Sequence, residues 1–408
     1  MTIQHFVTLI KSSIEKIIKT GFLFFMISCH GQINNTPVNQ QDINNTPPEY
    51  YGIPQNIISR DTSPAWAQAG QKLLLTGIVY EYDGKTPAAG IIIYYYHTNI
   101  HGKYLHKATE KGSLPPNKNG QTHGYIRGWV KTDSNGKYSI YTVRPGAYPT
   151  DEVPAHIHLT IQDPKTAKPY YIDDVVFDDD RLLTAEIRKK MENRGGSGVV
   201  RMVQKADLYI AERNIILGLN IPDYPTIKTS NVNSGINIGE DIMSFTPFHA
   251  WGPDKGTKTC PICKYGWYHG ILYFVGNKPN WAEIKDWLTF LEAESVNRTD
   301  YLKVYFIYGN ELEYDKADRE KTLAKIGQTL HLNKVALTFV PAFSDKDSDI
   351  YLSKINPETE NTLLIYKRSQ VIDKYINLKP IQENFNLISR RLDESINEYF
   401  VLPKAKHE

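Results

Sequence analysis

The sequence predicts a protein of several domains, in which an all-β sandwich is followed by a domain that alternates strands and helices. Three observations support this prediction. The chain has 408 residues, which is room for about two ordinary domains. Short apolar segments separated by turn signals fill residues 61–220, a pattern typical of a sandwich. The last third instead alternates strand-like runs with helical periodicity.

Composition and charge narrow the class of protein further. Hydrophobic residues make up 41% and charged residues 23% of the chain, which is close to the globular average and excludes wholesale disorder. The formal net charge is only +2, so no basic field predicts a nucleic-acid partner. The three cysteines, Cys29, Cys260 and Cys263, are too few for a disulfide scaffold or for a zinc site made of four cysteines.

Residues 1–28 are organised like a secretory signal peptide. Three lysines precede the apolar run 21–28, which is far shorter than the about 20 residues that span a membrane. The residues just before Cys29 resemble a bacterial lipobox, in which the cysteine becomes the lipidated first residue. We therefore expect an exported lipoprotein that Cys29 anchors to the membrane at the bacterial cell envelope. Plain secretion with an incidental cysteine is the alternative.

Residues 29–60 are expected to form a tether between this anchor and the first domain. The segment is rich in Asn, Gln, Thr and Pro, and the pentamer Ile-Asn-Asn-Thr-Pro occurs at 33–37 and again at 43–47. Such polar sequence cannot bury a core, so it is suited to a spacer.

The sandwich domain is predicted over residues 61–220. Unbroken apolar runs mark its strands, and the turn signal at 133–136 predicts a hairpin before an alternating segment. One helix should follow, and the glycine pair 195–196 would end it. The predicted elements are strands at 73–80, 91–96 and 137–143 and a helix near 184–193.

The α/β domain is predicted over residues 259–403, after a loop-rich linker at 221–258. Asn280 is placed to cap a helix whose apolar residues recur at i, i+3, i+4 and i+7. The predicted elements are strands at 270–275, 303–308 and 335–340, a hairpin of 363–366 with 371–376, and helices at 281–294, 315–330 and 381–396. This βαβαββα order resembles a thioredoxin-like domain.

A group of histidines and a tyrosine in the sandwich domain suggests a metal site. His156 and His158 would share one face of a strand and could bind one metal ion, while Ile157 packs behind them. By itself, His-x-His more often reflects paired surface histidines. Tyr148 follows a Pro-Gly turn at residues 145–146, which can direct its ring inward. The alternative is a packing tyrosine, the default in a chain with 27 tyrosines.

Several blocks in order resemble the intradiol ring-cleavage dioxygenase family, to which protocatechuate 3,4-dioxygenase belongs. The resemblance covers about residues 70–180 and is carried by the blocks 77–87, 99–107, 132–138, 144–148 and 154–158. It implies a sandwich of the intradiol dioxygenase or transthyretin-like type.

The resemblance also implies the ligands of a non-haem Fe(III) ion. Tyr104 would be the tyrosinate that stays bound, and Tyr148 the axial tyrosinate that leaves when substrate arrives. His156 and His158 would be the neutral imidazole ligands. Phenolate oxygens are hard donors and favour Fe(III) over softer or divalent ions, which agrees with this ligand set.

The implied activity is cleavage of a catechol-type aromatic ring by O2, a step in the catabolism of aromatic compounds. Both oxygens of the small aromatic diol would bind the iron, and the bond between the two hydroxylated carbons would be cut to give a muconate-type diacid. Tyr148 would accept one proton of the diol, which makes it the predicted catalytic residue.

Some positions depart from the family pattern. Val153 stands where the family usually has arginine, and Asp174 where it often has glutamine. Asp151 and Glu152 make the same loop acidic, which should disfavour acidic catechols. A transthyretin-like binding module with weak or no turnover is therefore an alternative function.

Cys260 and Cys263 form a C-x-x-C motif in a protein that is expected to be exported. In thioredoxins such a pair follows the first strand, whereas here it precedes the predicted strand 270–275. We expect a local disulfide rather than a redox or metal site. An envelope thiol–disulfide oxidoreductase that acts through the C-terminal domain is the alternative.

Overall fold

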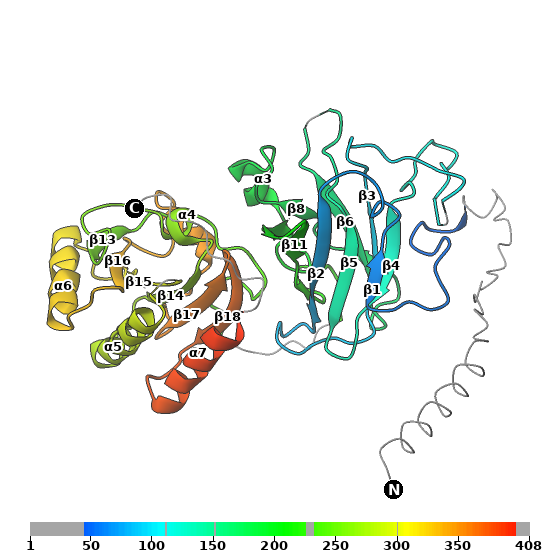
Figure 1. Cartoon of the computed structure of the whole chain (residues 1–408). Coiled ribbons are helices and arrows are strands. Elements are labelled where there is room, and N and C mark those ends of the chain that lie inside the picture. Colours follow the sequence, from blue (N-terminus) through cyan, green and yellow to red (C-terminus); the bar gives the residue numbers. More distant parts are fainter. Residues whose placement is uncertain (1–44, 111, 151, 226–231, 300, 397–408) are drawn as a thin grey trace, which may run out of the picture. The chain divides into compact units, whose positions relative to one another are not determined.

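The computed structural model describes residues 45–110, 112–150, 152–225, 232–299 and 301–396 (Figure 1). The predicted signal peptide, Cys29 and most of the predicted tether lie outside these ranges. Within them, no helix is both long enough and apolar enough to cross a membrane.

Two sheets form the first folded part of the chain. The first contains β1 (Arg60–Thr62), β2 (Lys72–Tyr80), β5 (Lys137–Val143), β10 (Met202–Lys205), β11 (Leu208–Glu212) and β12 (Ile215–Ile216). The second contains β3 (Ile92–His97), β4 (Arg127–Lys131), β6 (His156–Gln162), β7 (Tyr170–Tyr171), β8 (Val175–Phe177) and β9 (Val199–Val200). Their spatial orders are β1-β5-β2-β11-β10, with β12 beside β2, and β4-β3-β6-β8-β9, with β7 beside β6.

One hydrophobic core joins the two sheets. Leu73 and Leu75 of β2 contribute the alternate residues of the first sheet, and both are fully buried. Ile157 and Leu159 of β6 contribute those of the second sheet and belong to the same cluster. Two sheets that share one core form a sandwich, so the all-β prediction for this region is confirmed.

The end of the predicted tether packs against the sandwich. Arg127 donates hydrogen bonds to the carbonyl oxygens of Pro48 and Tyr51, at 2.5 and 2.7 Å. The indole nitrogen of Trp129 donates to the carbonyl oxygen of Glu49 at 2.8 Å. Tyr51 is buried, so this segment adds apolar contact as well as hydrogen bonds.

His97 is buried at the end of β3, where it is 1% exposed. Its Nδ1 lies 2.7 Å from the carbonyl oxygen of Thr98, and its Nε2 lies 2.8 Å from the hydroxyl of Thr142. Burial lowers the pKa of His97 to about 4, because desolvation penalises the charged ring.

The depressed pKa of His97 predicts a loss of stability in acid. Between pH 6.5 and 4 the unfolded chain binds a proton that the folded chain excludes, so stability falls as the pH falls. The full effect is about 3 kcal/mol, since each pKa unit corresponds to about 1.4 kcal/mol. Urea unfolding at pH 7 and pH 4 should show a smaller pH dependence in His97→Asn than in the wild type or in His331→Asn, which changes an exposed histidine. An unchanged pH dependence in His97→Asn would contradict this account.

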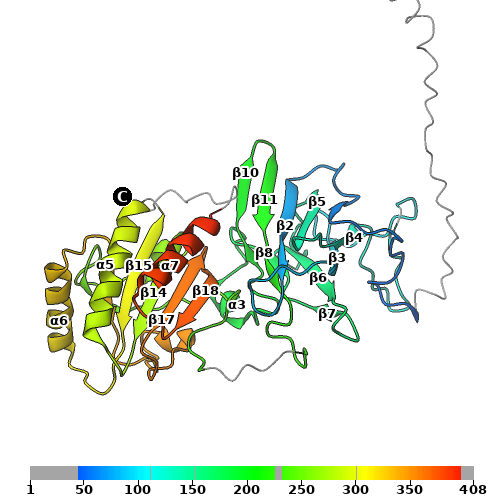
Figure 2. The ribbon, with the colours of Figure 1, turned by 90° about the horizontal axis from the view of Figure 1, so that it is seen from below.

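The second folded part is built on a third sheet. Its strands are β13 (Phe248–Trp251), β14 (His269–Val275), β15 (Leu302–Tyr308), β16 (Ala336–Phe339), β17 (Thr362–Lys367) and β18 (Gln370–Ile376). Their order is β13-β16-β15-β14-β17-β18 (Figure 1). Figure 2 shows β15, β14, β17 and β18 of this sheet from another side. Strands β14 and β15 are parallel, whereas β17 runs antiparallel to both β14 and β18.

The helices of this part are α4 (Pro261–Tyr265), α5 (Trp281–Asn297), α6 (Lys316–Thr329) and α7 (Gln382–Glu394), with a short 3-10 helix at Ile350–Ser353. Asn280 caps α5 as expected, because its side chain accepts a hydrogen bond from the backbone nitrogen of Glu283. The predicted order of strands and helices from 270 to 396 is confirmed. Strand β13, however, lies within the span that the sequence predicts as linker. The thioredoxin-like assignment stays a prediction.

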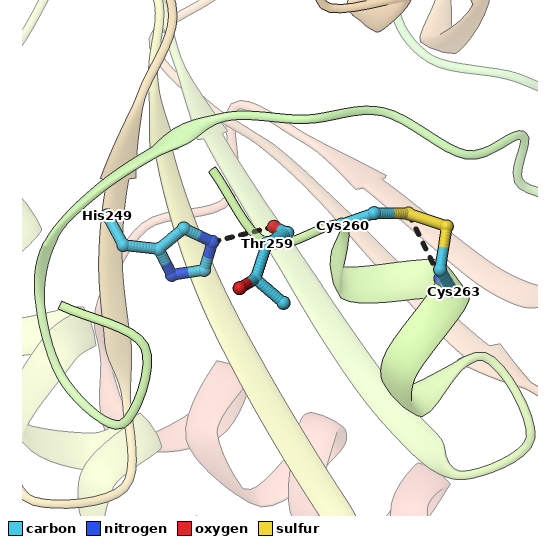
Figure 3. The surroundings of a disulfide bond; sticks show 4 residues. All are labelled: His249, Thr259, Cys260 and Cys263. Carbon is cyan, nitrogen blue, oxygen red and sulfur yellow. Dashed lines mark hydrogen bonds between the residues drawn. A yellow bond between two sulfur atoms is a disulfide. The ribbon is translucent and has the colours of Figure 1, made fainter. Parts of the chain in front are cut away.

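The cysteine pair forms a disulfide at the start of α4 (Figure 3). The sulfur of Cys260 accepts a hydrogen bond from the backbone nitrogen of Cys263 at 3.0 Å and so caps this short helix. Nearby, Nε2 of His249 donates to the carbonyl oxygen of Thr259 at 2.8 Å (Figure 3). The bridge lies between β13 and β14 in the sequence, so it closes a local turn in the connection between these two strands.

Candidate metal centre

Strand β6 presents two histidines on one face. Ile157, between them, is fully buried in the core of the sandwich, so His156 and His158 point to the opposite side. Tyr96 of β3 is the cross-strand neighbour of His158, and their rings stack with centroids 4.4 Å apart. This stacking supports the His158 ring from one side.

Two loops bring a tyrosine each to the same place. Tyr104 lies in the loop after β3, and Tyr148 in the loop after β5. The loops meet backbone to backbone, because the Gly146 nitrogen donates to the Asn99 carbonyl oxygen at 3.0 Å. The Thr98 hydroxyl also donates to the Gly146 carbonyl oxygen at 2.8 Å.

Close approach of the two loops requires glycine at residue 102. Gly102 has φ +71°, and a Cβ added there would lie 1.8 Å from the carbonyl oxygen of Ala147. The role of Gly102 is not visible in the sequence, because a glycine in a loop gives no sign of what lies against it.

Gly102→Ala is therefore expected to displace Tyr148 and to weaken iron binding at least about 10-fold, the lower end of the cost of disturbing a ligand's support. Gly120→Ala is the matched control, because Gly120 has a similar φ of +76° but nothing within 4 Å of an added Cβ. Titration of both metal-free variants with Fe(III) would measure the effect. Equal affinities for the two variants would show that the clash with Ala147 does not matter.

The four predicted ligands meet as a closed ring of donor atoms. The Tyr104 and Tyr148 hydroxyl oxygens are 3.0 Å apart, and the two histidine Nε2 atoms are 3.1 Å apart. The Tyr104 oxygen is 3.0 Å from Nε2 of His158, and the Tyr148 oxygen is 3.1 Å from Nε2 of His156. Metal–ligand bonds of about 2.1 Å at right angles place neighbouring donors about 3.0 Å apart, so these separations suit a single ion.

The hydrogen bonds of the two rings fix which nitrogen carries the proton. Nδ1 of His156 faces the carbonyl oxygen of Pro154 at 2.7 Å, and Nδ1 of His158 faces a carboxylate oxygen of Asp174 at 2.8 Å. Both partners are acceptors, so each Nδ1 must donate. The Nε2 lone pairs are then left facing the centre of the ring of donors, as metal ligands require.

Burial sets the protonation states at the centre. Desolvation lowers the pKa of His156, and the neighbouring His158 lowers it further, so His156 stays in the neutral form that binds metals. Desolvation raises the pKa of Tyr104 well above its ordinary value, and the hydrogen bond with Tyr148 raises it further. An ion at the centre must therefore displace a phenol proton when it binds.

The donor set fits a trivalent ion. Two phenolate oxygens compensate much of a 3+ charge, and two neutral imidazoles complete a set of hard and borderline donors. Asp174 also lies close enough to join the histidines in a metal-binding group. Its contact is with Nδ1 of His158, however, on the opposite side of the ring from Nε2, so it cannot bind the same ion as the two Nε2 atoms.

A cavity of about 580 Å³ opens beside the two histidines. One wall is apolar, with Leu183, Ile187 and Met191 spaced four residues apart along α3 (Ala185–Lys190) and its flanks. Thr184 caps this helix through the backbone nitrogen of Ile187. Val153 also lines the cavity and is 43% exposed.

The charged side chains of the cavity are largely paired. Arg194 lies 3.3 Å from Asp173 and 3.3 Å from Glu192. The cavity lining holds three carboxylates, including Asp174, against two cations, Lys190 and Arg194. The lining thus carries a small negative excess before any ion binds.

The sequence of the first folded part is similar to known dioxygenases. The family model described as "Dioxygenase" matches residues 54–212. The protocatechuate 3,4-dioxygenase beta chain of Burkholderia cepacia is 32% identical over 98 residues, which are 22% of this chain and 39% of that protein. The chain thus spans about two fifths of the length of that relative.

Two solved dioxygenase structures align with about two fifths of the chain. Catechol 1,2-dioxygenase from Acinetobacter sp. ADP1 is 18% identical, with a TM-score of 0.30, over 43% of this chain and 62% of that one. An intradiol ring-cleavage dioxygenase from Tetranychus urticae is 18% identical, with a TM-score of 0.31, over 41% of this chain and 90% of that one. The sequence matches carry the resemblance: residues 54–212 match the dioxygenase family model, and the chain is similar to an intradiol dioxygenase over 98 residues.

Proposed function

We propose that this protein is a non-haem Fe(III) dioxygenase that cleaves a catechol-type ring with O2 between its two hydroxylated carbons to give a muconate-type diacid. The observation that carries the proposal is the ring of four donor atoms from Tyr104, Tyr148, His156 and His158, with neighbours 3.0–3.1 Å apart. When bound, Fe(III) would supply the Lewis acidity and electron-accepting capacity that make a catechol reactive toward O2.

The two tyrosines are suited to different roles. Tyr104 packs with the aromatic cluster of Tyr94, Tyr96 and Trp129, which holds its ring in place. The Tyr148 ring contacts Tyr104 and His156 and does not belong to that cluster. Tyr148 is therefore the tyrosine that can swing away and accept a proton from the substrate at its phenolate oxygen.

The histidines and the cavity walls would orient the substrate. His156 and His158 would be held in place because the Nδ1 proton of each ring is bound on the side away from the donor atoms. The apolar wall at Ile187 and Met191 would suit the ring of a catechol. The negative excess of the lining favours catechols without an acidic substituent.

Oxygen uptake by iron-loaded protein tests the proposed reaction. Catechol should start uptake of one O2 per ring and yield a diacid, with protocatechuate a poorer substrate. Val153 stands where the family usually has arginine, so the experiment has a second informative outcome. Iron-loaded protein that binds catechol, changes colour and consumes no O2 would instead be a binding module.

We further propose that Cys29 is lipidated and anchors the protein at the cell envelope. The supporting feature is the short apolar run 21–28 after three lysines, directly before Cys29. Cys29→Ala should move the protein from the membrane fraction to the soluble fraction and leave its oxygen uptake unchanged. Wild-type protein that is already soluble and unlipidated would refute the anchor.

For the second folded part we propose a thioredoxin-like fold. Support comes from the parallel pair β14 and β15, which α5 connects, and from the antiparallel hairpin of β17 and β18 that α7 follows.

A further inference from the structure

One of the two site histidines has a charged partner on the far side of its ring. Oδ1 of Asp174, in the loop between β7 and β8, lies 2.8 Å from Nδ1 of His158. Nδ1 of His156 instead lies 2.7 Å from the neutral carbonyl oxygen of Pro154. The two imidazoles therefore differ in the charge of the group that accepts their Nδ1 proton.

The chain on both sides of Asp174 is held in place. Asp173 is 7% exposed and accepts a hydrogen bond from the backbone nitrogen of Asn193 at 2.8 Å. Val175 is fully buried and pairs with Ile157 of β6. A Cβ at Gly198 would lie 2.1 Å from the carbonyl oxygen of Asp174, so the backbones pack closely there as well. The carboxylate is thus directed at His158 by the fold.

The position of Asp174 determines what it can do. Nδ1 and Nε2 lie on opposite edges of an imidazole ring, and Nε2 of His158 is the atom that faces Tyr104 at 3.0 Å. Asp174 therefore supports the ring from outside the metal centre. A carboxylate in this position fixes the tautomer and ring orientation and raises the basicity of the ligand nitrogen.

The charge of Asp174 also acts on the ion. Attraction to a fixed negative charge grows with the charge of the cation, so a nearby carboxylate stabilises a 3+ ion more than a 2+ ion. The part of the cavity that Asp174 lines is partly shielded from water, since its side chain is 37% exposed and that of His158 is 19% exposed. Screening by solvent is therefore incomplete.

We propose that Asp174 is a positioning residue, which holds His158 in the Nδ1–H tautomer and makes the centre prefer Fe(III) over Fe(II). The identity of the ion rests on the proposed function, whereas the tautomer does not.

Two substitutions at Asp174 separate the effect of its hydrogen-bond acceptor from the effect of its negative charge. Asp174→Asn keeps an acceptor oxygen of the same reach and removes the negative charge, whereas Asp174→Ala removes both. Glu192→Gln is the matched control, because it removes one negative charge from the lining of the same cavity without a contact to His158.

The first measurement uses metal-free protein. Nitrogen NMR of the imidazoles should show His158 with its proton on Nδ1 in the wild type, in Asp174→Asn and in Glu192→Gln. In Asp174→Ala the Nε2–H tautomer should appear. A wild-type His158 that carries its proton on Nε2, or a tautomer that does not change in Asp174→Ala, would overturn the positioning role.

The second measurement is affinity for Fe(III) and for Fe(II), from competition with chelators. In Asp174→Ala the Fe(III) affinity should fall about 10–100-fold, the usual cost of losing such a partner. Fe(II) affinity should fall less, and Asp174→Asn should lower the ratio of the two affinities while keeping the tautomer. Equal losses for both ions would overturn the charge preference. Wild-type protein that binds iron but cleaves no catechol would refute the proposed function and leave this proposal standing.

Discussion

Tyr148→Phe is expected to lower the rate of catechol cleavage about 10²–10⁴-fold, the usual contribution of a positioned proton acceptor. The substitution keeps the ring that packs against His156 and removes only the hydroxyl oxygen. Three protein ligands remain, so the iron should still bind, although more weakly. Part of the tyrosinate-to-iron absorption should persist, because Tyr104 still supplies one phenolate.

Tyr104→Phe is the comparison that separates the two tyrosines. Tyr104 is expected to stay bound throughout the reaction and to tune the iron, so its loss should damage the resting site and most of its absorption. Oxygen uptake and visible spectra of the iron-loaded variants would be compared side by side. If Tyr148→Phe turns over catechol like the wild type and keeps the full absorption band, Tyr148 is a packing tyrosine and the assigned centre is wrong.

His156→Ala should have the second large effect, which is loss of tight iron binding. Loss of a partner that only supports a ligand costs about 10–100-fold in metal affinity, so removal of the ligand itself should cost at least about 100-fold. His156 is 6% exposed and belongs to the ring of donors, whereas His101 is exposed and lies in the same loop as Tyr104. His101→Ala should therefore retain a full complement of iron. Iron content of the two purified variants after identical loading is the measurement, and equal content would contradict the assignment.

The sequence predicts the strands and helices well where their patterns are local. The strand β6 places His156 and His158 on one face because of the alternation of a strand, and this follows from two residues and their spacing. The helix α5 is predicted from its apolar periodicity and from the cap at Asn280. Such features depend on neighbours along the chain, which a single sequence contains.

Features that depend on contacts between distant segments cannot be predicted from local sequence patterns. The close contact of Gly102 with Ala147 joins two loops that are about 45 residues apart, and no local pattern marks it. Asp174 is conspicuous in the sequence only as a departure from a family pattern, and its contact with His158 requires the pairing of β6 with β8. Strand β13 lies in a segment that looks like a loop, because only its pairing with β16 makes it a strand.

The packing of the segment that precedes the sandwich also depends on distant residues and could not be predicted. Residues 45–59 are polar enough to be predicted as tether, yet Tyr51 is buried and Arg127 binds two of the backbone carbonyls of this segment. A buried arginine needs partners, and backbone carbonyls from another segment supply them. The sequence around Tyr51 and the sequence around Arg127 give no sign of this contact.

Titration of metal-free protein with Fe(III), followed by visible absorption, tests the central claim most directly. The claim is that Tyr104, Tyr148, His156 and His158 bind one ferric ion. The absorption of tyrosinate bound to iron should rise in proportion to added Fe(III) and stop at one ion per chain, and the protein should turn red. A protein that binds one zinc ion per chain, takes up no Fe(III) and shows no visible band would contradict the assigned centre.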